Sequence, residues 1–308
     1  MEKVSESWVE KIWGNCDFKY AYKKSNGISG GLLMVWDPFL FTANCVVESD
    51  SFIAIKGFWK DVRTDLILVN TYGPYNDRDK KKMWQDLSDL LKYDGAMWVI
   101  FGDFNEVRFA SERKNTEFCD KRAKLFNDFI KDNSLIDLPL GGRIYTRISD
   151  DGRKFSKLDR YLVSENFLHH WPNINVMVLD KKHTNHCPLI LKDGNIDFGL
   201  KPVKVFDEWL KHKDSYDVIK KAWESKVNSV RPDCIFCDKL KIVKQELGKW
   251  YSTSDGKLKA EIDELSNRVN DWEKTAETSD LSESQHDMWL KDKELLLQKE
   301  KAQVEMLK

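Results

Sequence analysis

The chain has 308 residues, of which 41% are hydrophobic and 12% aromatic, and its formal net charge is −1. This apolar content is enough for a buried core and excludes disorder throughout, while the near-neutral charge excludes a simple polycationic nucleic-acid binder. No apolar run approaches the roughly 18 residues of a transmembrane helix, and the first residues lack a signal-peptide pattern. Six scattered cysteines are expected to be reduced thiols of an intracellular protein.

The first 200 residues alternate between predicted strands and predicted helices. Short apolar or alternating segments predict strands at 31–36, 51–56, 66–72 and 97–101. Apolar residues at helical spacing predict helices at 77–91 and 123–129. Two further strands are expected, one starting after Ser156 and one directly after His186. Strands with interspersed helices favour a layered α+β domain.

Residues 201–308 have a different composition, with 21 Lys and Arg and 22 Asp and Glu. Apolar residues recur at steps of four and three in 236–250 and in 258–272, and at steps of seven from Leu281 to Ala302. This spacing is typical of antiparallel helices that pack on one another, with a turn at 254–256. Because the segment 192–202 is rich in turn formers, we expect two domains, 1–195 and 196–308.

Polar side chains stand where the predicted strands end. Asp103 and Asn105 follow the strand 97–101, and Tyr72 closes the strand 66–72. A carboxylate beside an amide can orient or deprotonate a water and stabilise an oxyanion, and a tyrosine can donate to a phosphate oxygen. Taken alone, these residues are more often structural, as a capped turn and as an aromatic residue at the rim of a sheet.

Asp159 and His186 stand where two further strands begin. Asp159 could accept a hydrogen bond from the ring of His186 and fix its tautomer. The structural alternatives are a salt bridge of Asp159 with Arg160 or Lys157 and a histidine without a chemical role. The sequence alone leaves both possibilities open.

Four motifs in one order resemble the endonuclease/exonuclease/phosphatase superfamily, which has the DNase I-like fold. They are Asn-x-Tyr-Gly-Pro at 70–74, Gly-Asp-Phe-Asn at 102–105, Ser-x-Leu-Asp-Arg at 156–160 and Asn-His-Cys-Pro at 185–188. The stretches 29–37, 111–113 and 134–146 and the helical tract after residue 200 resemble plant LINE-type non-LTR retrotransposon proteins. In those proteins a helical connector and a reverse transcriptase follow the nuclease.

This resemblance implies a two-sheet β-sandwich flanked by helices, incomplete at its N-terminus and followed by an antiparallel helical or coiled-coil connector. The chain is expected to end before the reverse transcriptase. The implied activity is a divalent-metal-dependent phosphodiesterase that nicks DNA with Mg²⁺ or Mn²⁺. In it, His186 contacts the scissile phosphate or activates water, and Asp159 orients His186. Asp103 positions or deprotonates the water, and Asn105 and Tyr72 stabilise the pentavalent phosphate.

DNA as the implied partner calls for basic contacts to the phosphate backbone. Loop residues that could provide them are Arg108, Arg113, Lys114 and Arg143, although each is equally well explained as solvated surface charge. By analogy, a DNA substrate suggests the nucleus, and no membrane partner is expected.

The chain departs from the family pattern at two metal-binding positions. The family's metal-binding Glu is absent, and Met1 aligns just after it, so the chain is expected to begin one or two strands late. Asn185 stands where the family has Asp, and an amide is a weaker ligand for a hard cation than a carboxylate. We therefore expect weakened metal binding, impaired or absent activity and a marginally stable fold with unpaired strand edges. A longer gene product that restores the Glu is the milder alternative.

Three other functions remain open from the sequence. One is a phosphodiesterase of the same superfamily that acts on inositol or lipid phosphates. Another is a non-catalytic retroelement-derived fragment in which the helices of 236–307 pair with a partner helix or with a second copy. The third is a zinc site at Cys234 and Cys237, for which an isolated Cys-x-x-Cys is weak support.

Overall fold

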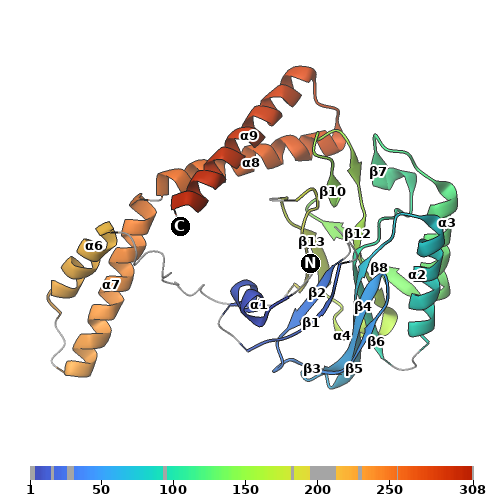
Figure 1. The fold of residues 1–308 in the computed structure, drawn as a ribbon, viewed down its shortest axis with the longest axis horizontal. Coiled ribbons are helices and arrows are strands. Elements are labelled where there is room, and N and C mark those ends of the chain that lie inside the picture. The colour runs from blue at the N-terminus through green and yellow to red at the C-terminus, as the bar shows by residue number, and fades with distance from the viewer. Residues whose placement is uncertain are drawn as a thin grey trace. The chain divides into compact units, whose positions relative to one another are not determined.

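The computed structural model describes residues 4–14, 17–25, 31–92, 96–181, 184–194, 213–227, 231–254 and 256–306. The chain forms two compact units, Met1–Ile196 and Asp197–Lys308. The first mixes strands and helices, and the second is helical (Figure 1). The predicted joining segment after residue 194, Glu2 and the start of the stretch 29–37 lie outside the described residues.

The first unit is built on a six-stranded sheet. Its strand order is β3 (Phe41–Glu48), β4 (Phe52–Trp59), β5 (Thr64–Tyr72), β6 (Met97–Asp103), β12 (Asp159–Ser164) and β8 (Leu135–Asp137). Strands β5 and β6 are parallel, and all other neighbours are antiparallel. The predicted strands at 51–56, 66–72 and 97–101 are confirmed, and each extends by a few residues. The extension of β6 to Asp103 brings a candidate catalytic residue into the sheet itself.

Two helices cover one face of this sheet, α2 (Asp77–Leu90) and α3 (Asp120–Asp132). The Trp84 ring stacks on Phe126 and on Phe129, with ring centroids 4.8 Å apart in both pairs. At the start of α2 the side chain of Asn76 accepts a hydrogen bond from a backbone N–H, which satisfies one of the free donors of the first turn. Both helices predicted from apolar spacing are therefore confirmed.

A second layer of strands covers the opposite face of the large sheet. It consists of an antiparallel pair, β1 (Lys19–Lys23) and β2 (Leu32–Trp36), and of a three-stranded sheet in the order β14 (Leu189–Asp193), β13 (Ile174–Val178) and β9 (Leu140–Gly141). Leu32 and Val176 from these two pieces share one core with Ile53 and Val99 of the large sheet. The unit is thus a two-sheet sandwich with helices outside, as the sequence resemblance implied.

The two pieces of the second layer are not paired with each other in the part of the chain that the structure describes. An apolar cavity of about 270 Å³ lies between the layers, and its lining includes Leu68, Phe101, Phe167, Trp171 and Leu191. Protein cores normally leave few voids larger than a water molecule. The sandwich is therefore incompletely filled on this side.

Smaller elements connect the layers. They are α1 (Glu6–Trp13), the 3₁₀ turn η1 (Ala110–Glu112), β7 (Arg113–Lys114), β10 (Arg147–Ile148), β11 (Phe155–Ser156) and α4 (Glu165–His170). Strands β10, β11 and β7 form a small antiparallel sheet. Strand β10 also forms a bridge with His186, so this small sheet borders the site described below.

The second unit contains the helices α6 (Lys213–Glu224), α7 (Pro232–Ser254), α8 (Gly256–Thr278) and α9 (Glu283–Met306). Helix α6 packs on α7, and α8 packs on α9. The predicted helical character is confirmed, and the break predicted at 254–256 separates α7 from α8. Across the described residues, no helix is both long and apolar enough to cross a membrane.

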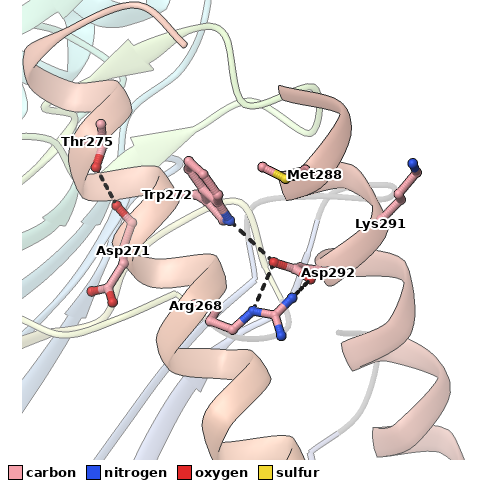
Figure 2. Close-up of a pocket in the computed structure, with 7 residues that line it drawn as sticks. All are labelled: Arg268, Asp271, Trp272, Thr275, Met288, Lys291 and Asp292. Atoms are coloured by element: carbon pink, nitrogen blue, oxygen red, sulfur yellow. Dashed lines mark hydrogen bonds and ion pairs between the residues drawn. The ribbon is translucent and has the colours of Figure 1, made fainter. Parts of the chain in front are cut away.

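The predicted seams of this unit are only partly buried. Leu247, Leu265 and Val269 are buried, whereas Phe236 and Met288 are 54% and 47% exposed. Helix α9 turns Asp292 toward α8, where the Arg268 guanidinium forms an ion pair with it and Trp272 Nε1 donates to it at 3.2 Å (Figure 2). The apolar positions 281, 288, 295 and 302 are therefore not the buried side of α9, whose buried residues, in its described part, are Trp289 and Asp292.

A cavity of about 480 Å³ lies beside this contact, and Asp271, Thr275 and Lys291 complete its lining (Figure 2). The Arg268–Asp292 ion pair neutralises the charges of both partners within the protein. The cavity therefore presents no cluster of groups poised for acid–base chemistry.

Candidate active site

Three of the predicted functional residues lie in one row across the large sheet. The parallel pairing of β5 and β6 aligns Tyr72 with Asp103, and the antiparallel pairing of β6 and β12 aligns Asp103 with Asp159. Aligned residues on neighbouring strands project to the same face of a sheet. The row therefore brings together residues from three motifs that are far apart in the sequence.

His186 lies beside this row and contacts both carboxylates. Its Nδ1 is 2.8 Å from Asp159 Oδ2, and its Nε2 is 3.9 Å from Asp103 Oδ2. Because a carboxylate accepts and does not donate, Nδ1 carries the hydrogen, and Nε2 is left facing Asp103. The imidazole is thus held in one orientation with its second nitrogen available for chemistry.

Asp159 is available to His186 because the neighbouring cations have other partners. Arg160 forms ion pairs with Glu112 and, at 2.8 Å, with Asp137, and Lys157 lies near the same two carboxylates. Successive residues of a strand point to opposite faces, so Arg160 lies on the other side of β12 from Asp159. The salt bridge considered as an alternative for Asp159 does not form.

Backbone geometry around Asp103 and Asn105 is unusual and specific. Gly102 has φ +126°, and a Cβ at this position would lie 2.2 Å from the carbonyl oxygen of Thr71. Asn105 has φ +47°, and its N–H donates to Asp103 Oδ1 at 2.8 Å. The strand predicted to end at residue 101 continues through Gly102 to Asp103, and the chain turns at Asn105. The glycine is needed for close approach to β5 rather than for a turn.

The buried ion pair of Lys80 and Glu106 stabilises the turn at Asn105. Lys80 Nζ donates to the carbonyl oxygen of Asn105 and to Glu106 Oε2, both at 2.5 Å, and both side chains are buried. Burial lowers the pKa of Lys80, and the hydrogen bond to Glu106 opposes that shift without cancelling it. The Asn105 side chain in turn donates to the carbonyl oxygen of Gly73 at 2.8 Å. No sequence motif predicted this contact.

Thr146 positions the start of β12. Its buried hydroxyl accepts hydrogen bonds from the N–H of Leu158 at 2.9 Å and from the N–H of Asp159 at 3.0 Å. A buried hydroxyl that satisfies two backbone donors fixes the chain locally. Asp159 is therefore positioned through its backbone as well as through its contact with His186.

Asp103 and His186 face each other, and the pKa values of both are raised. Burial, followed by the negative charge of Asp159, raises the pKa of Asp103 to about 6. Burial acts to lower the pKa of His186, but the hydrogen bond from its ring to Asp159 and the charges of Asp159 and Asp103 together raise it. A carboxyl with a pKa near 6 can exchange a proton close to physiological pH, as a general base requires.

An aromatic wall borders the polar row. The rings of Phe101 and Tyr161, which are aligned on β6 and β12, stack with centroids 5.6 Å apart. They line a cleft of about 390 Å³ together with Asp159, His186 and Leu189. The cleft can therefore hold a small charged group at the acids and an uncharged substituent against the rings.

The structure also shows the surroundings of Asn185 and of the four residues predicted to contact DNA. Asn185 is half-buried, and its carbonyl oxygen accepts from the N–H of Ile148 at 2.9 Å. Three of the four basic residues lie near internal carboxylates: Arg108 contacts Asp137 at 3.1 Å, Arg113 lies 4.0 Å from Glu106, and Arg143 is buried 3.5 Å from Asp180, whereas Lys114 lies over the Phe155 ring. Contact of these residues with DNA stays a prediction.

Two residues at the site carried no recognisable sequence signal. Arg147 pairs with His186 across an isolated antiparallel bridge, and the Tyr75 hydroxyl lies 3.4 Å from the Tyr72 hydroxyl. Neither belongs to one of the four motifs. Only the pairing of β10 with the segment around His186 reveals Arg147, since that contact joins distant parts of the sequence.

The donor set fits a divalent cation. Within the described part of the chain, Asp103, Asp159 and His186 are the residues whose ligand atoms could share an ion, and these atoms lie within 4.8 Å of one another. Two carboxylates with water are a usual protein contribution to Mg²⁺, and among the described residues His186, and no lysine or arginine, contacts the two carboxylates. Cys234 and Cys237 belong to no such group, so nothing in the described residues supports the zinc site.

No family model matches the chain, and the search of curated proteins found no match. Similar solved structures include the endonuclease domain of TRAS1, a telomere-specific non-LTR retrotransposon, at 13% identity and TM-score 0.43, over 57% of this chain and 80% of that chain. The AP endonuclease LMAP from Leishmania major is 14% identical, with TM-score 0.45 over 60% and 73%. An endonuclease/exonuclease/phosphatase family protein from Leptotrichia buccalis is 11% identical, with TM-score 0.44 over 63% and 80%.

Proposed function

We propose that this chain is a divalent-metal-dependent phosphodiesterase that nicks DNA slowly. The observation that carries the proposal is the contact of His186 with Asp159 and Asp103 at the end of the strand row, with Tyr72 aligned beside Asp103. The four sequence motifs that resemble the endonuclease/exonuclease/phosphatase superfamily supply all of these residues. Motif order and spatial convergence are independent observations, and both support the same chemistry.

Each of these residues has its own role in an in-line displacement at phosphorus. Asp103 positions the attacking water, and its pKa of about 6 leaves the carboxylate mostly ionised at neutral pH. His186, fixed by Asp159, donates from Nε2 to a phosphate oxygen in its protonated form. Tyr72 and the second N–H of the Asn105 amide donate to the charge that develops on the phosphate. Positioning and charge stabilisation together provide the acceleration.

A divalent cation would be held by the carboxylates of Asp103 and Asp159. When bound, Mg²⁺ or Mn²⁺ would act as a Lewis acid that polarises the phosphoryl oxygen. Asn185 contributes a neutral amide where the resembling family has a carboxylate, so we propose that the cation is held weakly.

The same sequence resemblance is the basis for proposing the origin of the chain and the cell compartment in which it acts. We propose that it derives from a plant LINE-type retrotransposon protein, with residues 196–308 as the connector that precedes a reverse transcriptase in that family. DNA as the substrate would place the activity in the nucleus. The helices of 236–307 would serve for pairing with a partner helix or with a second copy.

Nicking of a supercoiled plasmid by the purified full chain tests this function. We expect slow conversion to the open circle in Mn²⁺, none with a chelator and none with His186→Ala. Arg78→Gln, on an exposed position of α2, is the matched control and should leave the rate unchanged. Nicking that persists at full rate in His186→Ala would refute the assignment.

Phosphate esters of inositol or of lipid headgroups are the second substrate class, which the aromatic wall of Phe101 and Tyr161 could accommodate. Release of phosphate from these esters, measured beside plasmid nicking, distinguishes the two. Hydrolysis of the lipid esters without nicking would replace DNA as the substrate and leave the catalytic residues assigned as above.

A further inference from the structure

Arg147 lies next to His186 on the same side of the small sheet. The two residues face each other across an antiparallel bridge, and directly opposed residues in such a bridge project to one side with their Cβ atoms about 5 Å apart. Thr146 and Ile148, the neighbours of Arg147 in the chain, are buried, whereas Arg147 is half-exposed. Its side chain therefore points to the face that carries the His186 imidazole.

The guanidinium of Arg147 has no partner in the described part of the protein. It makes no ion pair and no hydrogen bond there, whereas Arg108, Arg113, Arg143 and Arg160 all lie within reach of a carboxylate. An arginine carries five N–H donors, so a half-exposed one beside a catalytic cluster has donors to offer a ligand.

The positive charge of Arg147 acts on titratable groups of the site. Burial and other groups set the net pKa shifts of Asp103, His186 and Tyr75, and the positive charge of Arg147 acts on all three as a smaller effect that lowers each pKa. These residues come from three different segments of the chain. Arg147 is thus near enough to His186, Asp103 and Tyr75 for its charge to act on all three.

We propose that Arg147 binds the phosphate group of the substrate through two of its non-bridging oxygens, with the Tyr72 and Tyr75 hydroxyls as further donors. This inference rests on the proposed function and names the residue that recognises its substrate. The planar fork of a guanidinium matches two oxygens of one phosphate, whereas a lysine offers a single point charge. The phosphate then lies between the Arg147 guanidinium on β10 and the carboxylates of Asp103 and Asp159 on β6 and β12. In this position Asp103 faces the phosphorus.

Binding without turnover tests this directly. The full chain is titrated in EDTA with a short DNA duplex and, separately, with inositol monophosphate, and the affinity of Arg147→Gln is compared with that of the unmodified chain. Because a charge-assisted bidentate contact is lost, we expect affinity to fall by about tenfold or more for both probes. Arg147→Lys keeps the charge but loses the fork, so it should fall between the two. Arg78→Gln is the control of equal charge change and should bind as the unmodified chain does.

The outcomes separate this inference from the proposed function. Unchanged affinity of Arg147→Gln for both probes would overturn the inference, even if the plasmid is nicked. Loss of binding in Arg147→Gln without any nicking by the unmodified chain would support the phosphate subsite and reject the nuclease. A loss confined to the DNA duplex or to the inositol ester would support the subsite and assign the substrate class.

Discussion

Asp159 and Arg160 are adjacent in β12, yet they belong to two buried charge clusters of opposite character. On one side of the strand, Arg160 is fully buried and pairs with Glu112 and Asp137, with Lys157 close to both carboxylates. On the other side, Asp159 shares a cleft with Asp103 and His186. The first cluster is neutralised within the protein, and the second is not.

The difference shows in the pKa values. Burial acts to raise the pKa of Glu112, but its hydrogen bond and charge interaction with Arg160 outweigh burial and lower it. Asp103 has no lysine or arginine in hydrogen-bond contact among the described residues, and burial with the charge of Asp159 raises its pKa to about 6, against the smaller opposing effects of His186 and Arg147. A buried carboxylate without a cation costs stability. Of these two clusters, the one that carries the electrostatic strain is the one where a ligand of the opposite charge can bind.

The largest expected effect comes from breaking the balanced cluster. Arg160→Met removes the cation between two buried carboxylates, and the free energy of unfolding should fall by about 3–5 kcal/mol. Urea denaturation of the full chain measures it. The double variant Arg160→Met with Glu112→Gln should recover part of the loss. A single variant as stable as the unmodified chain would show that this cluster does not hold the fold.

Lys80→Met should have a smaller effect of the same kind, about 2–3 kcal/mol, because Arg113 lies 4.0 Å from the Glu106 that is left behind. The variant also frees the carbonyl oxygen of Asn105, so nicking should slow even in conditions where the chain is fully folded. Adding Glu106→Gln should restore stability more than activity. Equal recovery of both would mean that Lys80 does not position the turn.

Asp103→Asn should act in the opposite direction and stabilise the chain. The folded-state pKa of about 6 lies above the ordinary value of 3.8, so ionisation of Asp103 costs stability progressively as the pH rises from about 4 to above 6. At pH 7 the Asn variant should gain about 1–3 kcal/mol and lose its activity. Thermal unfolding from pH 4 to pH 8 measures it. A variant less stable than the unmodified chain at pH 7 would contradict the account.

The smallest effect concerns His186. Its raised folded-state pKa contributes stability below the unfolded pKa of 6.5, and this contribution disappears as the pH rises through the folded value. Asp159→Asn should lower the ring pKa, because it removes the charge that holds the imidazolium. An NMR titration of the His186 ring, with the exposed His170 as internal reference, measures both values. A His186 pKa that is unchanged in Asp159→Asn would contradict the conclusion that Asp159 raises it.

The sequence predicted the parts of the site that sit on regular elements. Tyr72, Asp103 and Asp159 end or begin apolar strands, and the row they form follows from strand pairing, which the sequence resemblance supplied as a fold. The strand predicted to end at residue 101 continues to Asp103, because Gly102 approaches Thr71 closely within the sheet, and Asn105 makes the turn.

The remaining parts depend on contacts that no local pattern encodes. The Lys80–Glu106 pair and the bridge of Arg147 with His186 join segments that are far apart in the chain. In the helical unit, apolar spacing predicted helices correctly, but Phe236 on α7 and Met288 on α9 are exposed, and Trp289 and Asp292 are the buried residues of α9 where the structure describes it. Periodicity identifies an amphipathic helix and does not choose its neighbour.

The central claim is that Asp103 and Asp159 form an unneutralised site for a divalent cation beside a fixed imidazole. A calorimetric titration with Mn²⁺ tests it most directly, on the unmodified chain, Asn185→Asp and Asp103→Asn. The account predicts weak binding of one ion by the unmodified chain, tighter binding by Asn185→Asp and none by Asp103→Asn. Equal Mn²⁺ affinity of all three chains, or no binding by Asn185→Asp, would contradict it.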